Sequence, residues 1–354
     1  MSKIDRGKLA VLVGGQYGSE GKGAISAHLA DEYAIHVRVG SPNAGHTFYD
    51  KDGNKHVMQS IPCGWINKDA TIVIGRGALI NLKFLMDEIS HIMEYDPDFL
   101  HRLIIDSKAG ILSETFQEEE GGTEGEMHRR IGSTGEGVGP ARIARIQRDP
   151  EKFTLFGEVA PRLGLEDCLC RDTSAYLASM QDLGYNVMIE GTQGSALSLL
   201  HSHWPYCTSI DTNVAGIISE VGLAPSRVTD VIMVCRTYPI RVAGNSGPMK
   251  LEVSWEYLSD KLGRDVIEQT TVTKKVRRVG EWDQDLYEKA CRLNEPTAIA
   301  LTFCDYIDPK LHGATTMEAI EESELMQRFL ADTSLLGRVK YFGTGPSVIV
   351  ESED

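Results

Sequence analysis

The sequence predicts an α/β protein with a mainly parallel central sheet that is flanked by helices on both faces. Two observations support this fold class. Short aliphatic and β-branched runs recur along the 354 residues, and segments with apolar residues at helical spacing lie between them. No internal repeat and no Pro/Ser-rich linker interrupts this alternation, so residues 1–354 are expected to form a single domain.

The expected elements follow from the same two patterns. Because each is a short run rich in aliphatic or aromatic residues, strands are expected, in chain order, at 9–14 (LAVLVG), 35–39 (IHVRV), 71–74 (TIVI), 102–106 (RLIID), 186–190 (NVMIE), 230–235 (DVIMVC), 297–302 (TAIALT), 338–342 (RVKYF) and 347–350 (SVIV). Apolar residues three or four positions apart predict helices at 80–94, 173–183, 284–293 and 316–330.

The composition limits the classes of function. A formal charge of −15 argues against a nucleic-acid partner, although a nucleotide needs only a local group of cations. The seven cysteines form no CxxC pair, which is typical of reduced thiols in a cytoplasmic protein. The first residues, MSKIDRGK, contain no apolar signal region, and no stretch approaches ~18 apolar residues, so no membrane partner is expected.

One segment differs in composition from the rest. Residues 113–139 are rich in Glu and Gly and offer little apolar surface to bury. We expect an exposed, mobile segment there, whose last part, from Ser133, becomes ordered around a ligand.

A glycine-rich turn follows the first expected strand. Residues 13–24, VGGQYGSEGKGA, are similar to a phosphate-binding loop, but Gln16 stands where that motif has its first glycine, and Gly23 where it has Ser or Thr. The glycines could be simple turn formers. Alternatively, Gly18, Gly21 and Gly23 leave backbone N–H groups free to converge on an anion at the start of a helix near Lys22.

A second motif makes the anion-binding interpretation specific. Asn43-Ala-Gly-His-Thr follows the second expected strand, and together with Gly18-Ser-Glu-Gly-Lys-Gly it resembles the adenylosuccinate synthetase family. Further matches follow in one register: Ser133-Thr-Gly-Glu-Gly-Val-Gly-Pro-Ala with Arg148 downstream, Glu190-Gly-Thr-Gln-Gly-Ser, Pro205-Tyr-Cys-Thr-Ser, Val272-Thr-Lys-Lys-Val-Arg-Arg-Val-Gly, Thr302-Phe-Cys-Asp and Gly343-Thr-Gly-Pro.

The resemblance implies a fold and a reaction. The fold would be the phosphate-loop-like nucleotide-binding fold of this family. Its enzymes move the γ-phosphoryl of a nucleoside triphosphate onto the purine O6, and the amino group of L-aspartate then displaces the new phosphate. Such transfer is catalysed largely by positioning and by neutralising charge. The implied cofactor is Mg²⁺.

The resemblance also assigns residues. The implied catalytic residues are Ser19, Lys22 and His46, with His46 as the acid at O6. The implied donor-nucleotide site is Gly18, Glu20, Gly21, Lys22, Gly23, Ala24, Arg277, Phe303, Asp305, Gly343, Thr344 and Gly345. The implied acceptor site is Ser19, Asn43, Ala44, Gly45, His46, Ser133, Thr134, Arg148, Gln193 and Thr208, with Arg148 reaching across a homodimer interface. The implied aspartate site is Thr271, Val272, Thr273, Lys274, Lys275 and Arg277, and the metal positions are Ser19 and Gly45.

The basic stretch 274–278, KKVRR, is an anion site within an acidic protein or, as an isolated run would be, a solvated turn. Lys274 and Lys275 replace a glycine and an arginine of the bacterial family loop. Since lysine lacks the bidentate fork of arginine, the aspartate contacts are expected to differ, although a dicarboxylate still fits.

Ser19 is the departure with the greatest consequence. The family has an aspartate here, which removes the N1 proton of IMP and ligates Mg²⁺, and a serine hydroxyl does neither well at neutral pH. A small neutral side chain leaves room for the 2-amino group of guanine. This combination resembles the phage branch of the family, which acts on dGMP. Whether Glu20 or a water removes the proton is left open.

Phe303 is a second departure, since the family has a lysine that packs on the guanine of GTP. Asp305, which the family uses to read guanine, is retained. Phe303 stacks on any purine or is a core residue following the strand 297–302. The resemblance to the phage branch favours ATP or dATP as donor, whereas Asp305 keeps GTP possible.

Three functions remain open from the sequence. The first is a ligase that joins L-aspartate to dGMP, and the second is an ordinary adenylosuccinate synthetase that uses IMP and GTP. The third is an inactive nucleotide-binding protein, which the joint presence of Lys22, His46 and Gln193 opposes.

Overall fold

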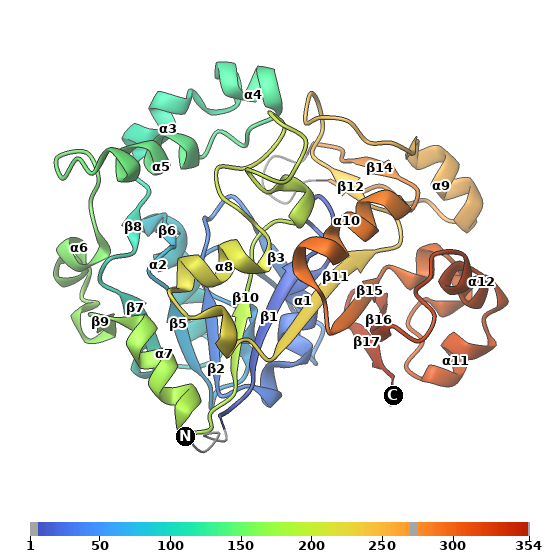
Figure 1. Ribbon diagram of the computed structural model, residues 1–354, viewed down its shortest axis with the longest axis horizontal. Coiled ribbons are helices and arrows are strands. Elements are labelled where there is room, and N and C mark those ends of the chain that lie inside the picture. The colour runs from blue at the N-terminus through green and yellow to red at the C-terminus, as the bar shows by residue number, and fades with distance from the viewer. Residues whose placement is uncertain (1–5, 270–274, 353–354) are drawn as a thin grey trace.

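A computed structural model describes residues 6–269 and 275–352. Within those ranges the central sheet has ten strands, and every neighbouring pair is parallel except β16 and β17 (Figure 1). In sheet order the strands are β17 (Val348–Glu351), β16 (Val339–Gly345), β15 (Ala298–Thr302), β11 (Asp230–Arg236), β1 (Leu9–Gly14), β10 (Val187–Glu190), β2 (Ile35–Arg38), β5 (Thr71–Ile74), β7 (Leu103–Asp106) and β9 (Leu169–Cys170). The predicted fold class is confirmed.

The middle of the sheet is buried on both faces. Every residue of β1 is buried, and its side chains alternate between two core clusters: Leu9, Val11 and Val13 pack in one, and Ala10 and Leu12 pack in the other. Such uninterrupted aliphatic runs are typical of parallel strands covered by helices on both sides. All nine predicted strands are present, and their ends differ by a few residues at most, while β9 was not predicted.

The helices surround this sheet. Their bounds are α1 (Lys22–His28), α2 (Leu82–Met93), α3 (Glu114–Glu120), α4 (Glu126–Ile131), α5 (Val138–Gln147), α6 (Phe156–Leu163), α7 (Thr173–Asp182), α8 (Val214–Val221), α9 (Trp255–Leu262), α10 (Gln284–Asn294), α11 (Met317–Glu322) and α12 (Glu324–Asp332). The helices predicted at 80–94, 173–183 and 284–293 are confirmed as α2, α7 and α10.

The single helix predicted at 316–330 is wrong, because the segment forms two helices. Ser323 leaves the helical conformation and caps α12, since its hydroxyl accepts from the Met326 N–H at 3.2 Å and donates to Asp308 at 2.7 Å. The apolar spacing continues across this break, so the pattern alone did not reveal it.

Small sheets complete the fold. In the described ranges they are the hairpin of β3 (His46–Tyr49) and β4 (Lys55–Met58), the pair β6 (Leu79–Ile80) and β8 (Gly110–Ile111), and the three strands β12 (Ile240–Arg241), β14 (Arg278–Gly280) and β13 (Glu252–Val253). The carboxyl ends of β1, β2, β10, β11 and β15 open toward one edge of the central sheet, which is where ligands bind in open α/β sheets.

Few of the described residues in the Glu/Gly-rich segment 113–139 are buried, but the segment has regular structure. It contains α3, α4 and the start of α5, and Phe116 and Val138 pack in a small core cluster. Figure 1 shows α3, α4 and α5 together at one side of the molecule, away from α9. Mobility of this segment stays a prediction. Among the described residues, no helix has both the length and the apolar character needed to cross a bilayer.

Candidate active site

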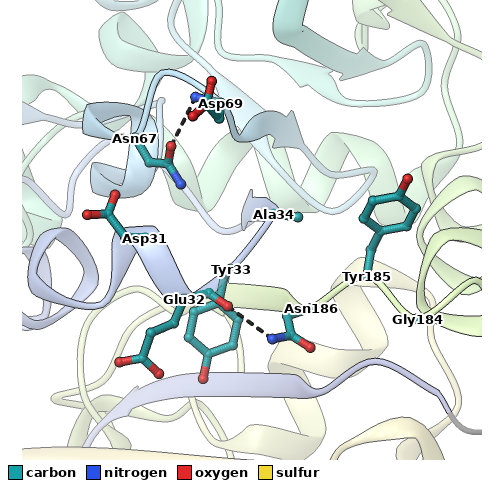
Figure 2. Close-up of a pocket in the computed structure, with 9 residues that line it drawn as sticks. All are labelled: Asp31, Glu32, Tyr33, Ala34, Asn67, Asp69, Gly184, Tyr185 and Asn186. Carbon is teal, nitrogen blue, oxygen red and sulfur yellow. Dashed lines mark hydrogen bonds between the residues drawn. The ribbon is translucent and has the colours of Figure 1, made fainter.

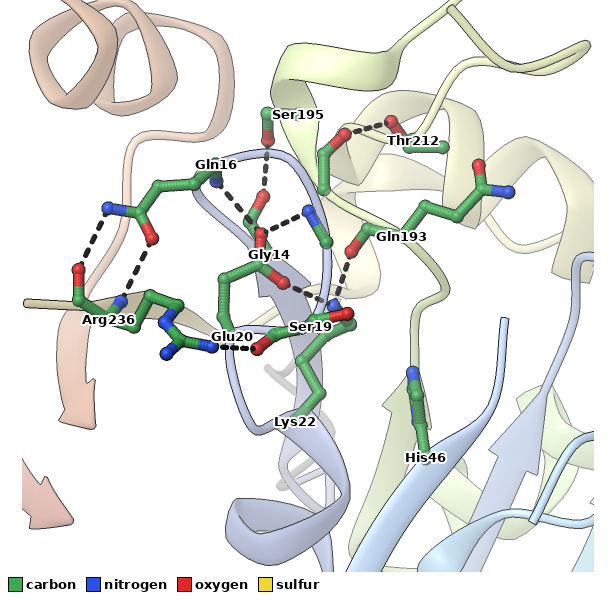
Figure 3. Close-up of polar contacts among 12 residues, drawn as sticks. Gly14, Gln16, Ser19, Glu20, Lys22, His46, Gln193, Ser195, Thr212 and Arg236 are labelled. Carbon is green, nitrogen blue, oxygen red and sulfur yellow. Dashed lines mark hydrogen bonds and ion pairs between the residues drawn. The ribbon is translucent and has the colours of Figure 1, made fainter. Parts of the chain in front are cut away.

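The loop between β1 and α1 is organised around the carboxylate of Glu20 (Figure 3). This side chain is fully buried: Oε1 accepts from the Gln16 and Gly18 N–H groups at 3.0 and 2.8 Å, and Oε2 accepts from Lys22 Nζ at 2.8 Å. Gly14 and Gly194 make room for it, since a Cβ on either would lie within 2.6 Å of a carboxylate oxygen. Glu20 therefore shapes the loop from within.

This arrangement corrects one expectation about the loop. The Gly18 N–H was predicted to be free for an external anion, but it is donated to Glu20. Lys22 is 2% exposed and bonds both Glu20 and the backbone carbonyl of Gln193. A buried carboxylate with these partners is not placed to remove a substrate proton. Of the two candidates for removing the N1 proton, Glu20 or a water, the geometry does not favour Glu20.

The start of α1 explains the glycine at position 23. α1 begins at Lys22, as predicted, and lies against β3. A Cβ on Gly23 would lie 2.9 Å from the Thr47 carbonyl oxygen and 3.0 Å from the His46 Cβ. The Ser or Thr of a usual phosphate-binding loop would not fit in this contact. The departure from the motif is therefore a packing requirement that brings Lys22 and His46 close together.

His46 is held by two side chains from neighbouring strands. Its Nδ1 lies 2.5 Å from Glu190 Oε1, at the end of β10, and 2.9 Å from Arg38 Nη1, at the end of β2. Arg38 also donates to Glu190 at 2.5 Å and to the Ala44 carbonyl at 2.6 Å. All three side chains are buried, so the ring is fixed in one orientation.

The charges of this triad set its protonation. Burial together with the Arg38 charge lowers the pKa of His46 to about 4. Burial disfavours the ionised form of Glu190, but His46 and Arg38 more than offset this and bring the pKa of Glu190 to about 2. At neutral pH the ring is therefore uncharged, with its proton on Nδ1 toward the carboxylate. Nε2 is left as the atom available to a ligand.

Cys63 lies beside the triad, and its Sγ, a His46 nitrogen and a Glu190 oxygen all fall within 4.8 Å of one another. The Arg38 guanidinium donates directly to the same Glu190 oxygen that His46 contacts. A cation at this point would face a buried positive charge, so the cluster does not fit a metal.

Ser19 lies at the exposed tip of the loop in the left-handed conformation, with φ 59°. Its hydroxyl accepts a hydrogen bond from Arg277 Nη1. Its carbonyl accepts one at 3.4 Å from Arg236 (Figure 3). Arg236 also pairs with Glu268. The structure thus brings together Ser19, which was predicted to contact the acceptor nucleotide, and Arg277, which was predicted to contact the donor nucleotide and aspartate.

The predicted acceptor residues of two loops meet at Gln193. Its Nε2 donates to Asn43 Oδ1 at 3.3 Å, and its Oε1 is buried without a hydrogen-bond partner among the described residues. Gly45 is exposed between Ala44 and His46. Thr208 is half-buried, and its N–H donates to the Leu197 carbonyl. A buried amide oxygen without a partner suits a polar ligand.

Ser133, Thr134 and Arg148 belong to the part of the chain that contains α3 to α5. The Ser133 hydroxyl donates to buried Glu120, and Thr134 is half-buried. Arg148 ends α5 in the left-handed conformation, with φ 58°, and is exposed. Ile143 and Ile146, on the same helix, are 56% and 75% exposed. In the described ranges of this chain, no hydrogen bond or ion pair joins Arg148 to His46 or Lys22.

The predicted donor-base residues also converge. Phe303 is half-buried, with the Arg236 guanidinium 3.7 Å from its ring centroid and the Tyr306 ring 5.2 Å away. Asp305 is 4% exposed and accepts from Arg264 and His312. Gly343, Thr344 and Gly345 lie at the end of β16, where the Thr344 hydroxyl donates to the Ala314 carbonyl at 2.7 Å.

Most of the predicted aspartate site lies outside the described residues: Thr271, Val272, Thr273 and Lys274. Lys275 and Arg277 are described. Lys275 Nζ lies 3.1 Å from His128 Nε2, and His128 Nδ1 lies 2.5 Å from the Ser133 carbonyl oxygen. The basic loop therefore approaches the loop that carries Ser133 and Thr134.

A cavity of about 590 Å³ lies elsewhere, at the opposite edge of the sheet (Figure 2). Its lining includes Tyr33 and Ala34, just before β2, and Tyr185 and Asn186, just before β10. Asn186 closes part of its wall by donating to the Glu32 carbonyl at 3.0 Å. It contains none of the predicted site residues, so the volume of this cavity is no guide to the chemistry.

Sequence reasoning missed several residues of the site. Glu190 was within a motif already noted, and Arg38 within a predicted strand, but a charged residue at a strand end does not reveal its partner. Arg236 and Arg264 gave no local signal. All four residues are recognised only from contacts between distant segments of the chain, such as the contact of Arg38 with Glu190.

Comparisons with known proteins show the family of this chain. The family model described as adenylosuccinate synthetase matches residues 11–159 and 154–340. The chain is 37% identical over 341 residues to an adenylosuccinate synthetase of Methanococcus aeolicus, covering 96% of this chain and 97% of the other. It is 37% identical over 325 residues to that of Methanocaldococcus jannaschii, covering 91% and 90%.

Two solved structures are similar along almost the whole chain. The succinoaminodeoxyadenylate synthetase of cyanophage S-2L, bound to dGMP and dATP as an energy donor, has a TM-score of 0.81 at 28% identity and covers 99% of this chain and 96% of its own. The fully ligated adenylosuccinate synthetase of Plasmodium falciparum has a TM-score of 0.85 at 21% identity, covering 98% and 100%. The second similarity concerns the fold alone.

Proposed function

Since this chain belongs to the adenylosuccinate synthetase family of carbon–nitrogen ligases, we propose that its substrates are dGMP, L-aspartate and ATP or dATP. The γ-phosphoryl would move to O6 of the purine, and the aspartate amino group would then displace phosphate from C6. The product would be 2-amino-2'-deoxy-N6-succinyladenylate. The observation that carries this proposal is Ser19, a small neutral side chain at the exposed tip of the catalytic loop.

Lys22 and His46 supply the groups that the first step needs. Lys22 carries a buried charge beside the start of α1, where it can neutralise charge that develops between phosphoryl oxygens. His46 is uncharged in the free chain, but a bound triphosphate brings negative charge, which raises the pKa of a nearby imidazole. We infer that His46 then carries a proton on Nε2 for the purine O6, while Glu190 holds Nδ1–H.

Ser19 favours dGMP over IMP because the two bases differ only in the 2-amino group. Both carry an N1 proton, so the lack of a carboxylate at this position, or of a free one at Glu20, does not separate them. The Ser19 oxygen has two lone pairs, and Arg277 uses one of them. The other can accept from the 2-amino group of guanine, a group that IMP lacks.

Mg²⁺ fits this site if phosphates supply most of its ligands. The hydroxyl of Ser19 and the carbonyl of exposed Gly45 are neutral oxygens, and the carboxylate of Glu20 is fully engaged. Mg²⁺ bound through substrate phosphates needs few protein ligands. Of the two predicted metal residues, Gly45 is the one we propose to hold the ion, since Arg277 and the 2-amino group use both lone pairs of the Ser19 hydroxyl, and the ion would neutralise charge on the donor phosphates.

Two further assignments belong to this proposal. ATP or dATP is the proposed donor, supported by the dATP bound to the cyanophage enzyme, with GTP as the alternative that Asp305 keeps open. A homodimer is the proposed assembly, in which Arg148 completes the partner's acceptor site. The exposed Ile143 and Ile146 beside Arg148 on α5 provide apolar surface for such an interface.

The second candidate is the ordinary reaction of IMP with GTP. It is favoured by the archaeal relatives, which are named adenylosuccinate synthetases and are more similar in sequence than the cyanophage enzyme. The two candidates differ in the acceptor base. An assay of both acceptors on one preparation therefore separates them.

The test is a product assay by mass spectrometry with Mg²⁺ and aspartate, pairing each of ATP, dATP and GTP with dGMP, GMP or IMP. We expect conversion of dGMP, and slower conversion of IMP, by about tenfold or more, because IMP lacks the 2-amino group that donates to Ser19. Ser19→Asp should impair dGMP use, because the larger carboxylate intrudes where the 2-amino group lies. Robust conversion of IMP with dGMP inert would refute the proposal and establish the second candidate.

A further inference from the structure

One oxygen of Asp305 holds two side-chain donors from separate segments. Oδ2 accepts from Arg264 Nη2 and, at 2.9 Å, from His312 Nδ1. Arg264 follows the end of α9, Asp305 lies in the short turn after β15, and His312 follows a second short turn. Among the described residues, no side chain donates to Oδ1. The carboxylate is therefore occupied on one side and open to a ligand on the other.

The residues around Asp305 border the predicted donor-base segment. The Gly313 N–H donates to the Thr344 carbonyl at 3.1 Å, and a Cβ on Gly345 would lie 3.6 Å from the Gly313 nitrogen. Gly313 itself has φ 76° and open space where a Cβ would stand. Arg264 and His312 are thus neighbours of the strand end that we propose to meet the donor nucleotide, although neither had been noticed in the sequence.

The bases differ in what they present to such a group. The Watson–Crick edge of guanine places two adjacent donors, N1–H and N2–H, before a carboxylate, and both oxygens are needed to accept them. The same edge of adenine alternates a donor, N6–H, with an acceptor, N1. A carboxylate with one free oxygen beside a guanidinium donor matches the alternating edge of adenine and conflicts with the paired donors of guanine.

Arg264 has donor capacity left for this purpose. Its Nη2 bonds Asp305, but its Nε is buried without a hydrogen-bond partner among the described residues. The Arg264 side chain is 35% exposed, so part of the guanidinium faces a ligand. Since Nε is buried, the donor that a base meets belongs to the exposed part of the guanidinium.

We propose that Arg264 is a specificity-determining residue for the donor base. By occupying Oδ2 of Asp305 and offering its own N–H, it directs this site to adenine nucleoside triphosphates and against guanine ones. The inference rests on the proposed function in one respect, that the donor triphosphate places its base beside Asp305. It is independent of which purine nucleotide accepts aspartate.

Equilibrium binding tests the inference without any turnover. ATP, dATP and GTP are titrated with Mg²⁺ against a fluorescent ATP analogue, in the absence of acceptor and aspartate. The wild type should bind ATP and dATP more tightly than GTP by about tenfold or more, because a site built to pair with one edge rejects the unmatched one. Arg264→Ala should reduce this ratio at least about tenfold, chiefly by tightening GTP binding.

Controls separate this effect from loss of structure. Arg328→Ala removes an exposed arginine that pairs with Asp332 on α12 and should leave the ratio unchanged. Arg264→Lys keeps a cation on Asp305 and should still disfavour GTP. If circular dichroism shows that Arg264→Ala is unfolded, His312→Ala replaces it and should shift the ratio in the same direction by a smaller factor.

The outcomes are decisive for this inference. Tighter binding of GTP than of ATP by the wild type, or an unchanged ratio in the folded Arg264→Ala variant, overturns it. The reduced ratio supports it even in a protein that fails to convert dGMP, because the acceptor is absent from the assay. Failure of the proposed acceptor and failure of this inference are thereby distinguished.

Discussion

Gly23→Ala is the change that most directly tests how the loop is placed on the fold. Gly23 is the second residue of α1, and nothing in its backbone requires glycine, since its φ is not in the left-handed region. By helix propensity alone, alanine would be more stable there by about 1 kcal/mol. The motif of usual phosphate-binding loops would even suggest a Ser or Thr. The packing predicts the opposite.

The magnitude follows from the contacts of the added methyl group. It would lie 2.9 Å from the Thr47 carbonyl oxygen and 3.0 Å from both the Thr47 nitrogen and the His46 Cβ. Comfortable separations are about 3.5–4.0 Å, so α1 and β3 must move apart by about half an ångström or more. Such overpacking costs about 1–3 kcal/mol, which offsets or exceeds the propensity gain. Displacement by up to about 1 Å costs about 100-fold in rate.

The assay compares urea unfolding and turnover for Gly23→Ala and for a matched control, Gly139→Ala. Gly139 is also the second residue of its helix, α5, and a Cβ there meets nothing within 4 Å apart from its chain neighbours, one of which is Pro140. The control should keep full activity and change in stability by less than about 1 kcal/mol, because crowding against the Pro140 ring offsets the gain in helix propensity. Gly23→Ala should lose up to about 2 kcal/mol and turn over about 100-fold more slowly. A Gly23→Ala variant that is more stable than wild type and fully active would refute the packing argument.

Lys22→Ala should slow turnover by about 10²–10³-fold, and near-normal turnover would remove the loop from the mechanism. Because this change leaves Glu20 buried without its cation, it should also lower the free energy of unfolding by about 3–5 kcal/mol. His46→Ala should abolish phosphoryl transfer in single-turnover assays while the donor still binds, and a loss of binding with an unchanged kcat would instead indicate a packing role. Because the pKa of His46 falls from 6.5 in the unfolded chain to about 4 in the folded one, the unfolded chain binds more protons between these values. Stability should therefore fall by about 3 kcal/mol as the pH drops from 6.5 to 4, and denaturant midpoints of the His46→Gln variant that retain this slope would contradict the assignment.

The sheet was predictable because its strands are buried on both faces. A strand such as β1 must be aliphatic at every position, and this makes its sequence unmistakable even without periodicity. Helix ends depend instead on single side chains. At Ser323 one hydroxyl caps α12 and bonds a neighbouring turn, so two helices replaced the one that the apolar spacing predicted.

The part of the candidate site that could be predicted is the part that glycine and histidine motifs mark. These motifs identified the loop with Lys22 and the turn with His46, but not what holds them. Arg38 and Glu190 are 152 positions apart and meet only because β2 and β10 are neighbours in the sheet. A sequence motif reveals residues that are close together along the chain, whereas contacts such as that of Arg38 with Glu190 depend on the order of strands in the sheet.

The same distinction decides what Glu20 can do in a loop whose tip carries Ser19. In sequence, Glu20 is the nearest carboxylate and looks able to act as a base. In the fold, successive residues of this turn point in opposite directions: Ser19 is exposed with φ 59°, and Glu20 is buried among the Gln16 and Gly18 N–H groups and the Lys22 ammonium. Turning Glu20 outward would break these bonds, leave the Gln16 and Gly18 N–H groups unpaired in the interior at a cost of about 1–3 kcal/mol each, and leave the Lys22 ammonium with only the Gln193 carbonyl. Glu20 is therefore committed to the loop, and Ser19 is the side chain that the tip of the loop exposes.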